Sequence, residues 1–148
     1  RRLVSEALQA RGWPTADDGR VDAALKGLGL TDGGQLRAFD PRRVGEAVGA
    51  PGLLYGTVEE FTYQNVGFIR RRAVRLSLRL VEAATGELLW EDSGEEVSSR
   101  LALRRGEAGR SFLEGVAEQA AETALGVPLM REARAAVDEA LSHLIRRF

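Results

Sequence analysis

The chain has 148 residues, 21 basic and 22 acidic side chains, a formal net charge of −1 and no cysteine. Such a length suits one domain that buries about two-thirds of its unfolded surface. The charge balance disfavours a nucleic-acid-binding or membrane-surface protein, because either would need a basic excess on one face. The missing cysteine excludes disulfides and thiol chemistry within these residues, and no run approaches the ~20 apolar residues of a membrane-spanning helix.

Two short helices are predicted before residue 30. Residues 2–11 carry apolar side chains at spacings of three and four, which predicts an amphipathic helix that ends before Gly12. Trp13-Pro14 is then expected to lead the chain back along the sheet, where Pro14 suits an edge. A second helix is expected to begin at an aspartate cap, Asp17 or Asp18, and to end near residue 29.

The segment that follows predicts a loop and a third helix. Residues 30–39 lose helical periodicity around Thr-Asp-Gly-Gly, which indicates a loop. Asp40 and Pro41 then suit the cap and the first helical position, so a helix is expected to begin there and to end before Gly49.

Residues 52–97 are the centre of the chain, because only they show sustained two-residue periodicity. Residues 53–63 are rich in β-branched and aromatic side chains and predict a first strand, with residues 64–69 as the link to a second strand over 72–82. The turn Ala83-Ala84-Thr85-Gly86 leads into a third strand over 87–97. The apolar side chains expected on the buried face of the second strand are Val74, Leu76, Leu78 and Leu80.

Two more helices are expected after the strands. Apolar side chains recur at helical spacing over residues 107–125 and again from Leu129 to Ile145. We expect Leu76, Leu78, Leu80 and Trp90 to share a buried face with the stripe of the 107–125 helix. The fold class is therefore α+β: an antiparallel meander plus an amino-terminal strand, with helices packed on one face, in a single domain over residues 1–148.

No residue pattern points to catalysis, a metal or a cofactor. His143 is the single histidine and no cysteine accompanies it, so a solvated helix-face residue is a better interpretation than a metal ligand. The serines lie in no Gly-x-Ser-x-Gly elbow, and the glycines form neither a dinucleotide-binding motif nor a P-loop. We therefore expect a non-enzymatic protein with no cofactor.

Four charged side chains are expected to mark the wet face of the sheet: Glu59, Arg75, Arg79 and Glu91. Arg75 or Arg79 would be the neighbours of Glu59 and Glu91, which gives a cross-strand charged lattice. The alternative is a general acid–base pair or a small-ligand site on the same face.

The link between the first two strands is unexpectedly apolar for a segment that should turn in water. It suggests a contact surface for a partner, formed by Phe61, Tyr63, Val66, Phe68, Ile69, Arg70 and Arg71. Two alternatives remain open. The apolar side chains could fold back over the end of the sheet, and the arginine run could be a solvated edge that discourages aggregation.

A resemblance rests on Gly49 to Phe61, with its Tyr-Gly-Thr-Val step, and on Val74 to Trp90, which ends in Thr-Gly-Glu-Leu-Leu-Trp. These residues resemble the centre of small lipoproteins of the Gram-negative envelope. That group is similar to curli-secretion-channel lipoproteins, to lipoprotein activators of penicillin-binding proteins and to the amino-terminal domain of the Tol-Pal propeller protein. The chain departs from the pattern because it has no lipobox cysteine and no strand before the first helix.

The resemblance implies a place and a kind of function. It implies a periplasmic domain of an outer-membrane lipoprotein, acting in protein–protein interaction or in envelope assembly or secretion. Its partners would be envelope proteins or further copies of itself, with no nucleic acid, and it would meet the membrane only through a lipid anchor. Since the chain begins at Arg1 and not at Met, we expect it to be a fragment, with the anchor and the amino-terminal strand outside it.

Overall fold

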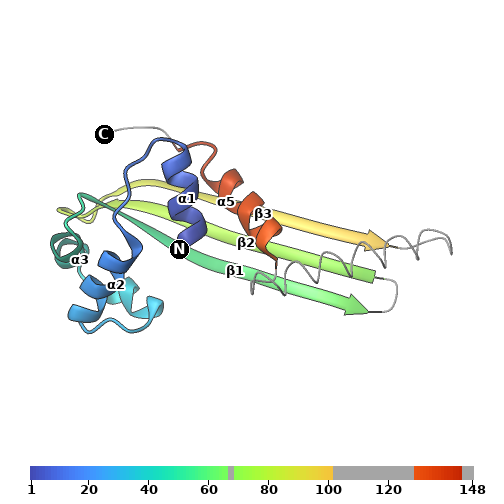
Figure 1. The fold of residues 1–148 in the computed structure, drawn as a ribbon, viewed down its shortest axis with the longest axis horizontal. Helices are drawn as coiled ribbons and strands as arrows, with labels where there is room; N and C mark the ends of the chain where they lie inside the picture. The colour runs from blue at the N-terminus through green and yellow to red at the C-terminus, as the bar shows by residue number, and fades with distance from the viewer. Residues whose placement is uncertain (67–68, 102–128, 145–148) are drawn as a thin grey trace. The chain divides into compact units, whose positions relative to one another are not determined.

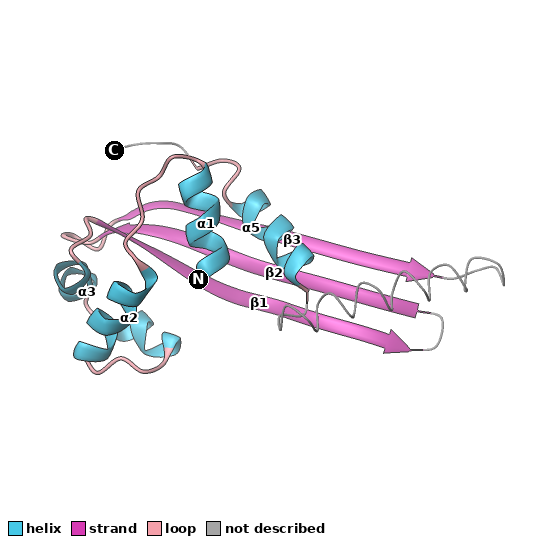
Figure 2. Ribbon diagram, viewed as in Figure 1, coloured by secondary structure: helices cyan, strands magenta, loops and turns pink. Residues whose placement is uncertain are grey.

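The computed structural model describes residues 1–66, 69–101 and 129–144. In these ranges helices precede and follow a sheet of three strands in the order β1-β2-β3 (Figures 1 and 2). The strands are β1 (Gly52–Val66), β2 (Ile69–Glu82) and β3 (Leu88–Leu101). The helices are α1 (Arg2–Ala10), α2 (Asp18–Gly27), the 3-10 helix η1 (Gly33–Ala38), α3 (Pro41–Val48) and α5 (Met130–Ala140). The predicted α+β class is confirmed.

The chain divides into two compact units, and each strand contributes residues to both of them. Unit 1 comprises Arg1–Thr57, Ser77–Asp92 and His143–Phe148, and unit 2 comprises Val58–Leu76 and Ser93–Ser142. Each unit therefore has its own helices. Helices α1, α2, η1 and α3 belong to unit 1, and α5 belongs to unit 2.

The central strand shows the predicted alternation. Val74, Leu76 and Leu78 are 2%, 7% and 2% exposed, whereas Arg75 and Arg79 are much more exposed. Leu80 and Trp90, which were expected on the same buried face, are half-buried. The 107–125 helix, expected to cover this face, lies outside the described residues.

The alternation ends where α3 packs in unit 1. Val81 and Ala83 are buried as well, although they lie at odd positions of the chain. A β-carbon added at Gly45 of α3 would lie 2.4 Å from the Ala83 methyl carbon, so a glycine allows helix and strand to meet here. Arg42 extends this contact, because its guanidinium donates to the Ala84 carbonyl at 2.9 Å.

The strands are longer than the sequence predicted. Residues 64–66 continue β1 and residues 69–71 begin β2, so most of the expected link is strand, and Phe61 and Tyr63 lie within β1 rather than at its end. Similarly, β3 continues to Leu101 although its periodicity fades after residue 93. Pairing with a neighbouring strand keeps these polar segments extended even where their sequence pattern is weak.

Strand β1 contains one extra residue relative to β2. In unit 1, Tyr55 stacks on Arg79, and a β-carbon at Gly56 would lie 3.2 Å from Leu78. Odd-numbered residues of β1 therefore share a face of the sheet with odd-numbered residues of β2 there, and even-numbered with even-numbered. In unit 2, Tyr63 stacks on Arg72 and Glu60 pairs with Arg71. Odd-numbered residues of β1 therefore share a face with even-numbered residues of β2 there, and even-numbered with odd-numbered. Because the even-numbered side chains of β2 are all buried from Arg72 to Leu78, the extra residue lies in β1 between Gly56 and Glu60. It is a β-bulge, and bulges are common on edge strands.

The first helices follow their caps. Asp17 and Asp40 accept hydrogen bonds from the backbone N–H groups of Arg20 and Arg42, both at 3.0 Å, and so begin α2 and α3 as predicted. The expected loop at residues 30–39 is wrong in part, because residues 33–38 form η1. The Asp32 carboxylate accepts from the Gly34 N–H at 2.6 Å, and Gln35 reaches back to the Asp32 N–H at 3.1 Å. This reciprocal cap stabilises a short helix in a sequence with two glycines.

Helix α5 packs against β3 in unit 2 through an unusually close backbone approach. A β-carbon at Gly94 would lie 1.8 Å from the Ala136 carbonyl oxygen, so only glycine fits. Ala136 and Ala140 are fully buried, and the Glu139 carboxylate accepts from the Glu95 N–H at 2.7 Å. The last helix was expected to continue to residue 145, but it ends at Ala140.

The expected amino-terminal strand is not among residues 1–51, whose regular elements are all helical. No described helix is long and apolar enough to cross a membrane.

Candidate interaction surface

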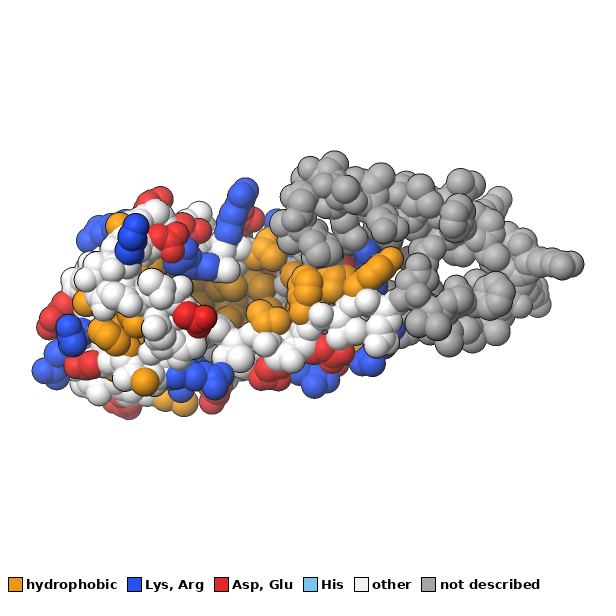
Figure 3. Space-filling model, turned by 90° about the horizontal axis from the view of Figure 1, so that it is seen from below, with side chains coloured by type: hydrophobic (Ala, Val, Ile, Leu, Met, Phe, Trp, Pro, Cys, Tyr) orange, Lys and Arg blue, Asp and Glu red, His pale blue; other side chains and the backbone are white. Residues whose placement is uncertain are grey.

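Strand β1 is an edge strand whose side chains are unusually apolar for their exposure. Val58, Phe61 and Tyr63 are 65%, 52% and 43% exposed. Figure 3 views the molecule from the side on which β1 lies, and hydrophobic side chains gather in a band from the middle of the described part to the residues drawn in grey. A contiguous exposed apolar band is typical of a protein contact surface.

One of the two aromatic side chains of this band is tied to the core of unit 2. The Arg72 guanidinium lies 5.3 Å from the centre of the Tyr63 ring and 3.4 Å from the Glu132 carboxylate of α5. The Arg72 and Glu132 side chains are 10% and 1% exposed. Tyr63 therefore forms the outer layer of a buried ion pair, whereas Phe61 has no such contact among the described residues.

The buried ion pair leaves one oxygen unused. Glu132 Oε1 accepts from Arg72 and lies 3.5 Å from Arg131, but Oε2 is buried without a hydrogen-bond partner in the described part of the chain. Glu132 was missed by sequence reasoning, because a glutamate in the first turn of an amphipathic helix is usually an exposed residue that favours the helix dipole.

The solvent-exposed face of the sheet carries paired charges, but the hydrogen-bond partner of Arg75 is not one of the expected residues. Arg75 binds Glu95 through two hydrogen bonds of 2.7 and 3.1 Å, and not Glu59 or Glu91. The hydrogen bond from Arg75 lowers the pKa of Glu95, and the Glu95 carboxylate in turn raises the pKa of Arg75. Glu59 and Glu91 are exposed.

The fourth member of the expected charged set lies in unit 1. The Arg79 guanidinium stacks on the Tyr55 ring at 5.2 Å. Burial raises the pKa of Tyr55, while Arg79 opposes that effect, and the Tyr55 hydroxyl is buried without a hydrogen-bond partner in the described ranges. Of the expected charged set, Glu59 and Arg75 belong to unit 2, and Arg79 and Glu91 belong to unit 1.

The remaining predicted contact residues are only partly described. Arg71 is about half exposed and pairs with Glu60 at 3.2 Å. Phe68 lies outside the described residues, and the side chains of Val66, Ile69 and Arg70 are also not described. What the structure brings together is thus a shorter surface on β1, with Phe61, Tyr63 and Arg71 as its predicted members.

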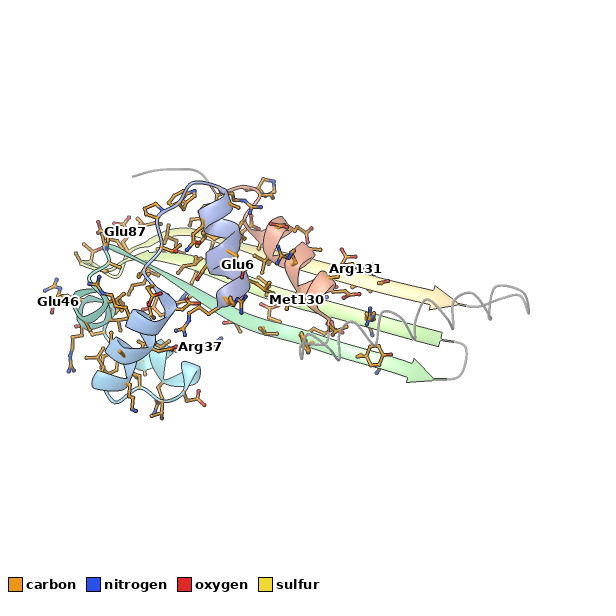
Figure 4. The ribbon with its side chains drawn as sticks, in the orientation of Figure 1. Glu6, Arg37, Glu46, Glu87, Met130 and Arg131 are labelled. Carbon is orange, nitrogen blue, oxygen red and sulfur yellow. The ribbon has the colours of Figure 1, made fainter. Side chains whose placement is uncertain are left out.

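The described residues offer little for other chemistry. They contain no group of three histidine, cysteine or acidic side chains that could hold a metal ion. His143 is exposed, as expected, and its Nδ1 lies 3.2 Å from an Asp92 carboxylate oxygen. A hollow of about 160 Å³ lies beside α1 and is lined mainly by charged and polar side chains, among them Arg2, Glu6 and Asp17. Figure 4 shows the side chains of this part of the molecule, with Glu6 labelled.

Comparison with solved structures supports the fold. The lipoprotein GNA1162 from Neisseria meningitidis is 24% identical, with a TM-score of 0.60 over 82% of this chain and 85% of that one. At this identity the likeness shows the fold alone. PelC from Paraburkholderia phytofirmans, described as a dodecamer, is 16% identical with a TM-score of 0.38, and covers 84% of this chain and 70% of that one.

A more distant likeness is to the LpoB C-terminal domain from Salmonella enterica, with 22% identity, a TM-score of 0.28, and coverage of 64% of this chain and 52% of that one. The TM-scores for PelC and LpoB are too low to support an argument. No curated protein sequence matches the chain. The family model described as "Putative lipoprotein GNA1162-like" matches residues 3–132, which is most of the sequence, so the chain belongs to the GNA1162-like lipoprotein family.

Proposed function

We propose that this chain is the non-enzymatic, periplasmic domain of a lipoprotein anchored in the outer membrane, and that it acts by binding an envelope protein or a further copy of itself. Membership of a lipoprotein family supports the place. The observation that carries the interaction is Phe61, which is 52% exposed in the middle of an edge strand.

An exposed aromatic side chain on an edge strand is a liability unless something covers it. Unpaired N–H and C=O groups along an edge attract other strands, and natural proteins usually counter this with charge, proline or a short strand. Strand β1 is long, and it presents Val58, Phe61 and Tyr63 to solvent. Aromatic residues in such positions dominate binding energy where they become buried in an interface.

Phe61 gives a cleaner test of this function than Tyr63. Replacing Tyr63 would also disturb the stacked Arg72 and its buried ion pair with Glu132, so a loss of binding could not be separated from a loss of stability. Phe61→Ser should leave the melting temperature within about 4 °C of the wild-type value, since the side chain is half exposed.

The experiment is site-specific photocrosslinking in cells of the source bacterium. A photoreactive residue at Phe61 should yield an adduct with one envelope protein or with a second copy, in the outer-membrane fraction. Leu88 is the matched control, because it is 51% exposed on the other edge strand. Equal adducts at the two positions, or none at position 61, would contradict the contact; recovery from the cytosol would contradict the location.

A further inference from the structure

The three strands differ sharply in charge. Strand β2 carries five arginines, Arg70, Arg71, Arg72, Arg75 and Arg79, and one acid, Glu82. Strand β1 carries Glu59 and Glu60 and no basic residue, and β3 carries four acids and one arginine. The sheet therefore has a basic central strand between two acidic edge strands.

Strand β1 already binds one basic strand, and its contacts show how. On its inner side, Glu60 pairs with Arg71 at 3.2 Å, and Tyr63 and Tyr55 stack on Arg72 and Arg79 at 5.3 and 5.2 Å. One carboxylate and two aromatic rings of β1 thus meet three arginines of β2, so a charge pair and cation–π contacts hold the two strands together.

Strand β1 has further acidic and apolar side chains that do not take part in those contacts. Glu59 is exposed and has no ion-pair partner among the described residues, and Val58 and Phe61 are more than half exposed. The bulge lies between Gly56 and Glu60, so the strand from Glu60 onward keeps regular alternation. Residues 58–63 thus present an anion, an aromatic ring and an outer edge that no described strand pairs with.

We propose that the outer edge of β1, from Val58 to Tyr63, takes an extended segment of an envelope protein as a fourth strand, and that this segment alternates basic or polar residues with apolar ones as Val74 to Leu80 of β2 do. The inference rests on the proposed function and names the chemistry of its partner. Backbone hydrogen bonds supply affinity in strand addition, and Glu59 and Phe61 supply selectivity for a basic, apolar segment.

Charge disfavours a second copy as the occupant. The available edges of another copy are again β1 and β3, and both are acidic. Pairing either with β1 would place carboxylates opposite carboxylates, which destabilises a sheet. The acidic edges thus oppose edge-to-edge association of identical chains and favour a basic strand.

The test uses a peptide with the sequence of residues 69–82, Ile-Arg-Arg-Arg-Ala-Val-Arg-Leu-Ser-Leu-Arg-Leu-Val-Glu, because β1 is known to pair with this strand. We expect saturable binding of the labelled peptide to the intact chain by fluorescence anisotropy, with hydrogen exchange slowed at residues 58–63. The control peptide has the same composition with its arginines gathered at one end, so charge is unchanged and alternation is lost. Equal binding of the control peptide would overturn the proposal.

Variants of the chain locate the site. Glu59→Lys should raise the Kd of the peptide about fivefold, and Phe61→Ser about tenfold. Glu46→Lys is the matched control, since this exposed carboxylate projects from α3 (Figure 4), and it should change the Kd less than about twofold. Unchanged binding by both β1 variants, or protection that appears outside residues 58–63, would overturn the assignment.

Two further outcomes separate this inference from the broader function. If protection of residues 58–63 rises with chain concentration in the absence of peptide, the occupant is a second copy and the basic-segment proposal is wrong. If the peptide fails to bind while crosslinking at Phe61 still captures a partner, the proposed function stands and only the strand-addition chemistry fails.

Discussion

The two units hold their helices against the sheet with different chemistry. In unit 1, α3 meets the turn after β2 through small residues, Gly45 against Ala83, with an exposed arginine donating to a carbonyl. In unit 2, α5 meets the sheet through a buried ion pair, Arg72 with Glu132, and through the close approach of Gly94 to Ala136. The unit 1 contact depends on shape, and the unit 2 contact depends on both shape and charge.

The two kinds of contact predict which substitutions should destabilise each unit most. An apolar contact loses stability in proportion to the volume removed, because the neighbouring side chains fill the gap only partly. A buried ion pair behaves otherwise, since removing one partner leaves the other charge without compensation in a poorly solvated place. Unit 2 should therefore respond to single charge changes far more strongly than unit 1.

The largest effect should come from Glu132→Ala. The Arg72 side chain is 10% exposed, and loss of its carboxylate partner should lower the free energy of unfolding by about 3–5 kcal/mol in a urea titration. The double variant Arg72→Met/Glu132→Leu is the control, because an apolar pair of similar volume should recover most of that loss. If the single variant costs no more than the double one, the ion pair is not a determinant of unit 2.

The apolar core of unit 1 gives the next effect. Leu78 is 2% exposed on the inward face of β2, so Leu78→Ala should cost about 2–5 kcal/mol in the same titration. Arg79→Ala, one residue along on the exposed face, should cost no more than about 1 kcal/mol. A loss below about 0.5 kcal/mol at Leu78 would contradict the face assignment.

Two glycines, one in each unit, test how closely the helix approaches its neighbouring backbone. Gly94→Ala should cost about 1–3 kcal/mol, because the added carbon meets the Ala136 backbone, which cannot move without shifting α5. Gly45→Ala should cost less, since it meets a methyl group and also gains up to about 1 kcal/mol of helix propensity. Gly27→Ala is the control, because nothing lies within 4 Å and the change should be neutral or stabilising. A larger loss at Gly45 than at Gly94 would reverse the ranking.

Sequence reasoning predicted the strands, the caps and the inward face because each rests on local chemistry. Asp17 and Asp40 cap the helices that follow them, and Leu76 and Leu78 are buried where alternation placed them. The structure corrected the predictions that depend on how neighbouring strands pair. Arg75 of β2 meets Glu95 of β3, a pairing that no local pattern in the sequence predicts.

For the candidate surface, sequence reasoning named Phe61 and Tyr63 but did not predict how far the strand around them extends. It placed them at the end of the first strand, beside the link, whereas β1 continues past both to Val66, because pairing with β2 extends a segment whose own periodicity is weak. It also missed Glu132, since no local pattern tells that the first turn of α5 is buried against Arg72. Long-range contacts decide both features, and a single sequence does not record them.

The smallest effect concerns the exposed ion pair of unit 2, between Arg75 and Glu95, and it separates surface charge from buried charge. The hydrogen bond from Arg75 holds the pKa of Glu95 below its unfolded value, so the folded state favours the carboxylate. Its contribution to stability is therefore present above the unfolded pKa and is lost as the pH falls through the folded pKa. Stability curves of the wild type and Glu95→Gln should differ slightly near about pH 6 and converge toward about pH 3.

The neighbouring Glu96→Gln variant controls for the loss of one negative charge on the same strand. It should not reproduce the effect of Glu95→Gln, because the two hydrogen bonds from Arg75 go to Glu95. Added salt should shrink the Glu95 effect further, since both side chains are more than 40% exposed and are screened by solvent ions. A pH dependence of Glu95→Gln that matches the wild type throughout would mean that this pair contributes nothing. Charge would then stabilise unit 2 only where it is buried, at Arg72 and Glu132.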